Sequence, residues 1–256
     1  MFNYQAPADL LKDRTILVTG AGDGIGAAAA VAYAQAGATV ILLGRTVKKL
    51  ETVYDQIEAN GGKQPALFPL NLESAGESDY VALANAIDEN FGQLDGVLHN
   101  ASLLGNITPA EQYPLDVWNR VMQVNVNAAF ALTRFLIPLL RKAPDPSLVF
   151  TTSSVGRTGR AYWGAYAVSK FATEGLVQVL ADELGGKHDP IRVNAINPGA
   201  TRSRMRATAY PGENPDNNPP PNDIMPLYLY LMGPDSRGIS GKSLDAQGHD
   251  TPEALC

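Results

Sequence analysis

The chain has 256 residues, of which 45% are hydrophobic, and this is enough for a substantial core. Its 26 acidic and 20 basic residues give a formal net charge of −6, which excludes a basic surface of the kind that binds nucleic acid or anionic membranes. A single cysteine, Cys256, excludes an intrachain disulfide; no apolar run reaches a membrane-spanning length, and no leader pattern opens the chain. The sequence therefore predicts a cytoplasmic protein with no membrane partner, no nucleic-acid partner and no metal site.

The stretch 16–36 has the pattern of a strand, a glycine turn and a helix. The apolar run 16–18 is typical of a strand buried on both faces, and the alanine-rich run 27–36 favours a helix. Glycines in the turn permit positive φ and close approach of a ligand, and the start of the helix directs free N–H groups at an anion such as a pyrophosphate. The spacing GxxxGxG differs from GxGxxG, but the order of elements predicts a dinucleotide site made by Gly20, Gly22, Asp23, Gly24, Ile25 and Gly26.

Strands and helices then alternate with short connections. An arm is expected over 1–13, and Pro138 is a candidate boundary of the long helical pattern 114–140. This alternation predicts an α/β fold: a Rossmann-type doubly wound, mostly parallel sheet of about seven strands, in one catalytic domain over 1–256. Further strands are predicted at 39–43, 66–68, 96–98, 147–150, 191–196 and 243–246, and further helices at 50–57, 81–91, 114–140, 165–184 and 226–232.

The stretch 205–222 interrupts this regularity. It is rich in proline and asparagine, including the run Asn217-Asn218-Pro219-Pro220-Pro221. This composition is more typical of a mobile loop than of a regular element. We expect a mobile lid here that becomes ordered over substrate and cofactor.

Candidate catalytic residues follow the strand at 147–150. Tyr166 and Lys170 are four residues apart in the helix 165–184, so the ammonium can lie near the phenol. A free tyrosine ionises near pH ~10, and a neighbouring cation lowers that pKa, as general acid–base catalysis requires. The Ser153 hydroxyl can bond the same substrate oxygen. Such pairs are also common on helix surfaces, but the position at a strand end of a nucleotide-binding sheet favours catalysis.

Together these motifs resemble those of the classical short-chain dehydrogenase/reductase family, in order and spacing, over about residues 13–248. Within that family the chain is most similar to the YciK-type bacterial oxidoreductases, through 10–14, 98–101 and 223–229. The resemblance implies an oxidoreductase that interconverts a carbonyl and an alcohol. It rests on Thr19-Gly20-(x)3-Gly24-Ile25-Gly26, Asn100-Ala101, Asn125-Val126, Ser153, Tyr166-(x)3-Lys170 and Pro198-Gly199.

The resemblance also implies roles. Tyr166 would donate or accept the proton, and Ser153 would orient the carbonyl. Lys170 would bind the nicotinamide ribose and depress the tyrosine pKa. Asn125 would hold a water in the proton relay, although an amide on a helix surface is the alternative. Further cofactor contacts are implied at Asn71, Leu72, Asn100, Ala101, Pro198, Gly199 and Thr201.

Three positions depart from the family pattern. Asn71 replaces the usual aspartate near adenine, Ser102 replaces a glycine, and His99 replaces an asparagine. For Asn71 we expect weaker discrimination of the base and no loss of binding. Ser102 is expected to alter the backbone approach to the cofactor. His99 is expected to pack at a strand end and to take no part in catalysis.

The end of the second strand bears on cofactor choice. Gly44 stands where NAD-preferring relatives carry an acidic residue, and Arg45 follows it. Without a carboxylate for the 2′-hydroxyl, and with a guanidinium that can clamp a phosphate, NADP(H) is favoured over NAD(H). Asp23 argues for NAD(H), since many NADP-preferring relatives carry a basic residue in the glycine turn.

Two other functions stay open. One is reduction of a 3-oxoacyl thioester, in which an acidic carrier would face the arginines; the other is a non-catalytic dinucleotide sensor or scaffold. The substrate pocket is expected at Leu103, Leu104, Tyr162, Trp163 and the loop 205–222. The arginines in question are Arg157, Arg160, Arg202, Arg204 and Arg206.

The helices at 114–137 and 165–184 carry apolar residues over more than one face. Helices of this kind are usually buried by further protein, and in the family they form the subunit interface. We therefore predict a homodimer or homotetramer. The apolar residues are Val121, Phe130, Phe135, Phe171, Leu176 and Val179.

Overall fold

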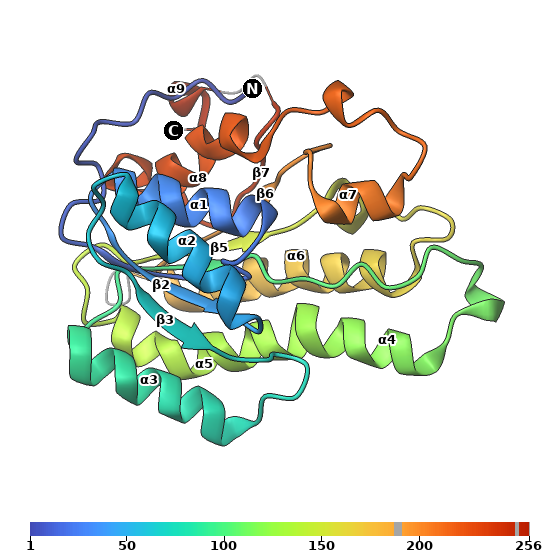
Figure 1. Ribbon diagram of the computed structural model, residues 1–256, viewed down its shortest axis with the longest axis horizontal. Helices are drawn as coiled ribbons and strands as arrows, with labels where there is room; N and C mark the ends of the chain where they lie inside the picture. Colours follow the sequence, from blue (N-terminus) through green and yellow to red (C-terminus); the bar gives the residue numbers. More distant parts are fainter. Residues whose placement is uncertain (187–190, 249–250, 256) are drawn as a thin grey trace.

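The computed structural model describes residues 1–186, 191–248 and 251–255, so the single cysteine, Cys256, lies outside the described residues. Seven parallel strands form one sheet in the order β3-β2-β1-β4-β5-β6-β7 (Figure 1). This confirms the predicted Rossmann-type doubly wound sheet, and each predicted strand segment holds one strand. The strands are β1 Thr15–Thr19, β2 Thr39–Gly44, β3 Ala66–Pro69, β4 Gly96–His99, β5 Ser147–Thr151, β6 Arg192–Asn197 and β7 Ser243–Asp245.

Helices cover both faces of the sheet (Figure 1). On one face lie α1 Gly24–Gln35, α2 Val47–Ala59 and α8 Met225–Met232, and on the other lie α3 Glu77–Phe91, α4 Leu115–Met122, α5 Ala128–Leu140 and α6 Gly164–Leu184. Because successive strand residues point to opposite faces, Ile16 and Val18 pack in the first core, whereas Leu17 packs in the second. The apolar run 16–18 is therefore fully buried, as its composition predicts.

Some local predictions differ from the structure. The pattern 114–140 is one continuous helical stretch in three parts, α4, a π-helical turn Gln123–Asn127 and α5, and Pro138 lies inside α5 without ending it. The expected loop 205–222 contains most of helix α7 Arg204–Ala209, the 3₁₀ turn Pro215–Asn217 and the start of a second 3₁₀ turn, Pro221–Ile224. The prediction of irregular structure is wrong for these parts. Further short elements are Ala110–Gln112, Ser154–Gly156, Pro234–Ser236 and α9 Pro252–Leu255.

The N-terminal arm is held against the core. Phe2 is buried against the ring of Tyr230 in α8, and its N–H donates to the carbonyl of Ala246 at 3.0 Å. Leu11 is fully buried. The arm expected over 1–13 is thus part of the packed structure.

Among the described residues, one stretch, Leu115–Leu140, is long and apolar enough to cross a membrane by length and composition alone. In the structure it carries Leu132 and Leu136, which are buried in the core beneath the sheet. A core helix has the same composition, so the stretch is weak evidence for a membrane span.

Candidate active site

A cleft of about 650 Å³ opens at the carboxyl ends of the strands, where β1 and β4 diverge to opposite halves of the sheet. Ligands of doubly wound sheets bind at this point. The cleft brings together nearly all the residues predicted from the sequence. Those that line it are Gly20, Gly22, Asp23, Gly24, Ile25, Arg45, Asn71, Leu72, Asn100, Ala101, Ser153, Tyr166, Lys170, Pro198, Gly199 and Thr201.

The glycine turn has the geometry that the sequence predicts for phosphate binding. Gly20 and Gly24 adopt positive φ, at 68° and 54°. A Cβ on Gly20 would lie 2.9 Å from the Cα of Ala101, and one on Gly26 would overlap the carbonyl of Gly20. Gly26 therefore supports the turn from within and does not line the cleft. Among the described residues no side chain caps the start of α1, and the N–H groups at a helix start favour an anion.

Asn100 connects the turn to the middle of the sheet. Its backbone N–H and that of Ala101 both donate to the Thr19 hydroxyl at 3.0 Å. Its side-chain oxygen accepts from the Thr151 hydroxyl at 3.2 Å. Thr151, which is not among the predicted site residues, thereby ties the end of β4 to the end of β5.

Tyr166 is buried in the cleft wall with its phenol close to the hydroxyl of Ser153. Burial raises the pKa of Tyr166 to about 12, and a hydrogen bond with Ser153 opposes this rise. The phenol is therefore protonated at neutral pH and available as a proton donor.

Lys170 lies one helical turn further along α6, with its Nζ 5.5 Å from the centre of the Tyr166 ring. The ammonium donates to the carbonyl of Thr151 at 2.8 Å. Burial lowers the pKa of Lys170 to about 8, while the charge of Glu174 opposes that change. Burial is the largest influence on the Tyr166 pKa, and the predicted depression of that pKa by Lys170 stays a prediction.

Asn125 occupies the π-helical turn, a local distortion that is frequent at functional sites. Its side-chain oxygen accepts from the N–H of Leu103 at 2.7 Å, and its amide donates to the carbonyl of Leu103 and to the Ser169 hydroxyl. Asn125 is buried, so the surface-amide alternative is wrong. With Lys170 it lines a small separate cavity of about 10 Å³, roughly the space one water requires.

The turn after β6 is held by a residue that sequence reasoning missed. Gly199 has φ 70°, and the amide of Gln247 donates to the carbonyls of Pro198 and Ala200, each at 2.9 Å. A Cβ on Gly199 would lie 2.8 Å from the Gln247 side chain. Gln247 follows the last strand, β7, and is 48 residues from Gly199 in the sequence. No local sequence pattern therefore predicts this contact.

The end of the cleft that is predicted to bind the substrate is apolar and aromatic. Leu103, Leu104 and Trp163 line it as predicted. Tyr162, which is predicted to line it as well, is 58% exposed and does not line the cleft. From α7 and the segment after it come Met205, Ala209 and Tyr210, and the Trp163 ring lies between those of Tyr166 and Tyr210, at 5.8 and 6.0 Å.

His99 packs at the end of β4, as predicted. Its ring stacks on Phe150 at 4.6 Å, and its Nε2 lies 2.9 Å from the Thr133 hydroxyl. Burial lowers the pKa of His99 to about 3, so the ring is neutral.

A sequence model described as short chain dehydrogenase matches residues 14–214. This chain belongs to the short chain dehydrogenase family. Its members are oxidoreductases that act on alcohol and carbonyl groups, so the predicted family and enzyme class are confirmed.

Known members of the family include close relatives. The chain is 57% identical to the uncharacterised oxidoreductase YciK of Escherichia coli strain K12, over 96% of each sequence, which confirms the predicted YciK-type subgroup. A short chain dehydrogenase structure from Pseudomonas syringae superposes with a TM-score of 0.95 at 62% identity, covering 96% of this chain and all of that one. Another, from Escherichia coli CFT073 in complex with NADPH, has a TM-score of 0.92 at 57% identity and covers 94% of this chain and all of that one.

Proposed function

We propose that this chain is an NADP(H)-dependent oxidoreductase in which Ser153, Tyr166, Lys170 and Asn125 form the catalytic set. One observation carries the proposal. The buried Tyr166 phenol, the Ser153 hydroxyl and the Lys170 ammonium meet in the same cleft as the glycine turn. A bound dinucleotide and a substrate carbonyl would therefore share one enclosed space.

Tyr166 is the proton donor in carbonyl reduction. Its phenol is protonated at neutral pH, and Ser153 is placed to hold the same substrate oxygen. Lys170, whose pKa is about 8, keeps much of its positive charge at pH 7 and stabilises the phenolate as it forms. When bound, NADP(H) supplies or accepts the hydride.

Asn125 positions a water in the proton relay that includes Lys170. The small cavity beside it is lined by both Asn125 and Lys170, so a water there can link the lysine to the interior of the π-helical turn. Asn125 also fixes Leu103 at the substrate end of the cleft through two hydrogen bonds.

NADP(H) fits the residues present. The glycine turn leaves a cradle that side chains would fill, and the N–H groups at the start of α1 face the cleft. At the end of β2, Gly44 carries no carboxylate and Arg45 lines the cleft. The similarity to a relative in complex with NADPH supports the same choice, with Asn71 and Leu72 at the adenine end.

The test is oxidation of NADPH in the presence of a panel of ketones, aldehydes and acetoacetyl thioesters. We expect turnover on at least one ketone or aldehyde. Binding of NADPH without turnover on any of them would favour the sensor or scaffold function. Preference for the thioesters would favour the 3-oxoacyl reductase.

Three of the five arginines give that last alternative little support, because each pairs with a carboxylate. Arg157 pairs with Asp245 at 2.8 Å, Arg202 with Asp216 at 3.1 Å and Arg206 with Glu213 at 2.6 Å. Their charge is therefore neutralised within the chain. A docking face for an acidic carrier needs unneutralised charge.

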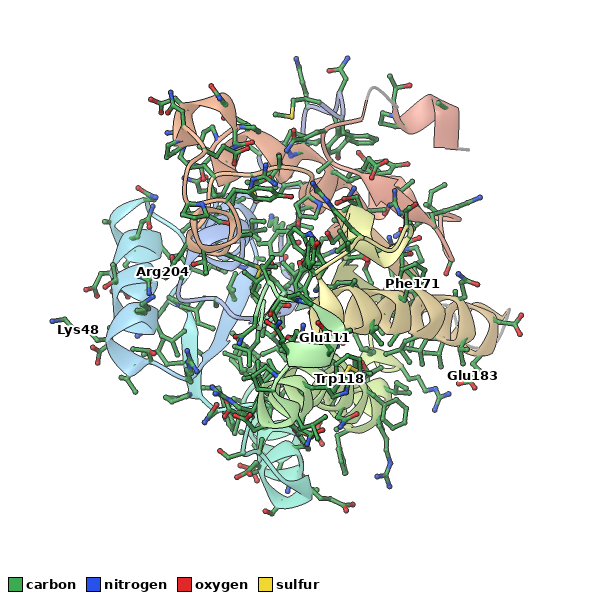
Figure 2. All side chains as sticks on the ribbon, turned by 90° about the vertical axis from the view of Figure 1, so that its right-hand side faces the viewer. Lys48, Glu111, Trp118, Phe171, Glu183 and Arg204 are labelled. Carbon is green, nitrogen blue, oxygen red and sulfur yellow. The ribbon has the colours of Figure 1, made fainter. Side chains whose placement is uncertain are left out.

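We also propose a twofold assembly through α5 and α6. Phe130, Phe171 and Val179 are 51%, 45% and 53% exposed, which is high for large apolar side chains, and Phe171 lies on α6 in Figure 2. Val121 is buried and takes no part in this surface. Light scattering at micromolar concentration should give a homodimer or homotetramer, and a stable monomer would contradict the proposal.

The segment 205–222 is proposed as a mobile lid, although it holds helix α7. It supplies Met205, Ala209 and Tyr210 to the substrate end of the cleft, so opening it would expose that end. Limited proteolysis should cut it first in the free protein and more slowly with NADPH and substrate present. Equal cleavage in both states would rule out a lid.

A further inference from the structure

Three charged side chains from three elements meet at the rim of the cofactor cleft. Asp23 lies in the glycine turn, Lys49 in the first turn of α2, and Arg204 at the start of α7. The Lys49 ammonium lies 2.5 Å from one carboxylate oxygen of Asp23, and the Arg204 guanidinium lies 3.6 Å from the same oxygen. All three residues line the cleft.

The stem of Lys49 is packed against the glycine turn. A Cβ on Gly22 would lie 2.9 Å from the Cβ of Lys49, so the absence of a side chain at Gly22 gives the lysine its place. The lysine is thus positioned by its contact with the turn as well as by its charge.

Lys49 lies where the 2′-position of the adenosine ribose is expected. In doubly wound sheets this position is read at the end of the second strand, by a carboxylate for NAD or a cation for NADP. Here that end is Gly44, followed by Arg45 and by Thr46, whose hydroxyl does not cap α2. All three residues line the cleft together with Lys49.

We propose that Lys49 is a second cation, beside Arg45, that binds the 2′-phosphate of NADP(H). Before the phosphate binds, Asp23 holds the Lys49 ammonium in place; when it binds, Lys49 exchanges the carboxylate for the phosphate. The proposal rests on the proposed cofactor. It also removes the objection that Asp23 raises against NADP(H): the acidic residue in the glycine turn is the counterion of a basic residue supplied by α2.

The charges make this exchange feasible. The hydrogen bond from Lys49 lowers the pKa of Asp23, so Asp23 is a carboxylate at neutral pH. The Lys49 and Asp23 side chains are 38% and 50% exposed, and an ion pair so open to water is weak. A phosphate dianion bonds an ammonium more strongly than a carboxylate does. Arg204 remains beside Asp23 after the exchange, so the carboxylate is not left unpaired.

Binding of 2′,5′-ADP (adenosine 2′,5′-bisphosphate) and 5′-AMP, measured by calorimetry on the full chain, tests the proposal without catalysis. The ratio of the two affinities measures the contribution of the 2′-phosphate to binding. Lys49→Met should lower that ratio about tenfold, and Lys49→Arg should largely preserve it. Lys48→Met is the matched control: Lys48 is the neighbouring exposed lysine of α2, it does not line the cleft and it points away from it (Figure 2), so its loss should change the ratio less than twofold.

Asp23→Asn removes the counterion that competes with the phosphate, and should raise the ratio several-fold. A ratio within twofold of wild type in Lys49→Met would overturn the role of Lys49. An unchanged or lowered ratio in Asp23→Asn would overturn the exchange. Neither result depends on turnover, so a chain that reduces no carbonyl would refute the proposed enzyme and leave this test intact.

Discussion

Buried charged groups have more partners at the amino end of the parallel sheet than at its carboxyl end. At the amino end, the buried carboxylate of Asp145 contacts Arg14 at 2.6 Å, Arg192 at 3.3 Å and Arg237 at 3.4 Å. Arg192 donates in addition to the carbonyls of Leu231 and Gly233, at 2.9 and 3.1 Å. At the carboxyl end, the buried ammonium of Lys170 has one hydrogen bond among the described residues, to the carbonyl of Thr151.

The difference separates stability from function. Paired charges at the amino end join the starts of β1, β5 and β6 to the segment after α8, and they leave few donors for a ligand. At the carboxyl end, donors such as the Lys170 ammonium have few partners within the described part of the protein and can bind a cofactor or a substrate. Active sites are commonly destabilised in this way.

The largest effect expected at the carboxyl end is on rate. Tyr166→Phe removes one hydroxyl and should lower kcat by about 10²–10⁴, because the proton then has no positioned donor. NADPH affinity, followed by fluorescence titration, should stay near wild type, since the glycine turn, Arg45 and Lys170 are intact. Lys170→Ala should lower both affinity and turnover, and the double variant should be little worse than either single one. Turnover near the wild-type rate in Tyr166→Phe would remove Tyr166 as the acid.

The corresponding change at the amino end should affect stability and not catalysis. Asp145→Asn leaves the buried guanidinium of Arg192 without a carboxylate, which should lower the free energy of unfolding by about 3–5 kcal/mol. Urea denaturation measures this loss, and kcat of the folded variant should match wild type.

The control for that experiment is Asp88→Asn. Asp88 pairs with Lys142, and both side chains are about half exposed. Loss of an exposed pair should change the free energy of unfolding by about 1 kcal/mol or less. Equal effects of the two variants would mean that the amino-end cluster contributes no more than a surface ion pair.

Lys170→Met tests whether the buried ammonium of Lys170 lowers the stability of the fold. Burial lowers the pKa of Lys170 from 10.5 to about 8, so below pH 8 the unfolded chain holds this proton more tightly than the folded chain. Lys170→Met should therefore raise the free energy of unfolding at pH 7, by about 1–3 kcal/mol. Because the penalty disappears as the pH rises through 8 towards 10.5, the gain should shrink over that range. A loss of stability at pH 7 would show that the hydrogen bond to Thr151 outweighs the burial of the charge.

The sequence predicted the carboxyl end far better than the amino end, for a physical reason. The glycine turn and the Tyr166–Lys170 pair are local patterns, in which a few adjacent positions specify the geometry. Arg14, Asp145 and Arg192 are distant in sequence, and each of them alone is typical of a surface charge. Only the parallel pairing of β1 with β4, β4 with β5 and β5 with β6 brings them together.

Tertiary contacts also explain what was missed within the site. Asp23 argues against NADP(H) in the sequence, because its partner Lys49 is 26 residues away on another helix. The π-helical turn that holds Asn125 was not predicted, since the helical pattern continues on both sides of it, in α4 and α5. Helix α7 forms within a stretch whose prolines and asparagines are concentrated after residue 210.

Two buried serines give the smallest and most direct test of the contrast. At the amino end the Ser147 hydroxyl donates to the carbonyl of Leu231 at 2.7 Å, whereas the buried Ser102 hydroxyl, which lines the cleft, has no partner among the described residues. Ser147→Ala should lower the free energy of unfolding by about 1 kcal/mol, and Ser102→Ala should raise it by a similar amount in the free protein, because a buried unpaired hydroxyl is unfavourable. If that hydroxyl is held for the cofactor, Ser102→Ala should also weaken NADPH binding about three- to tenfold. Lower stability with unchanged NADPH affinity in Ser102→Ala would instead mean that the hydroxyl contributes to the packing of the loop. The contrast between the two ends of the sheet would then rest on Lys170 of α6 alone.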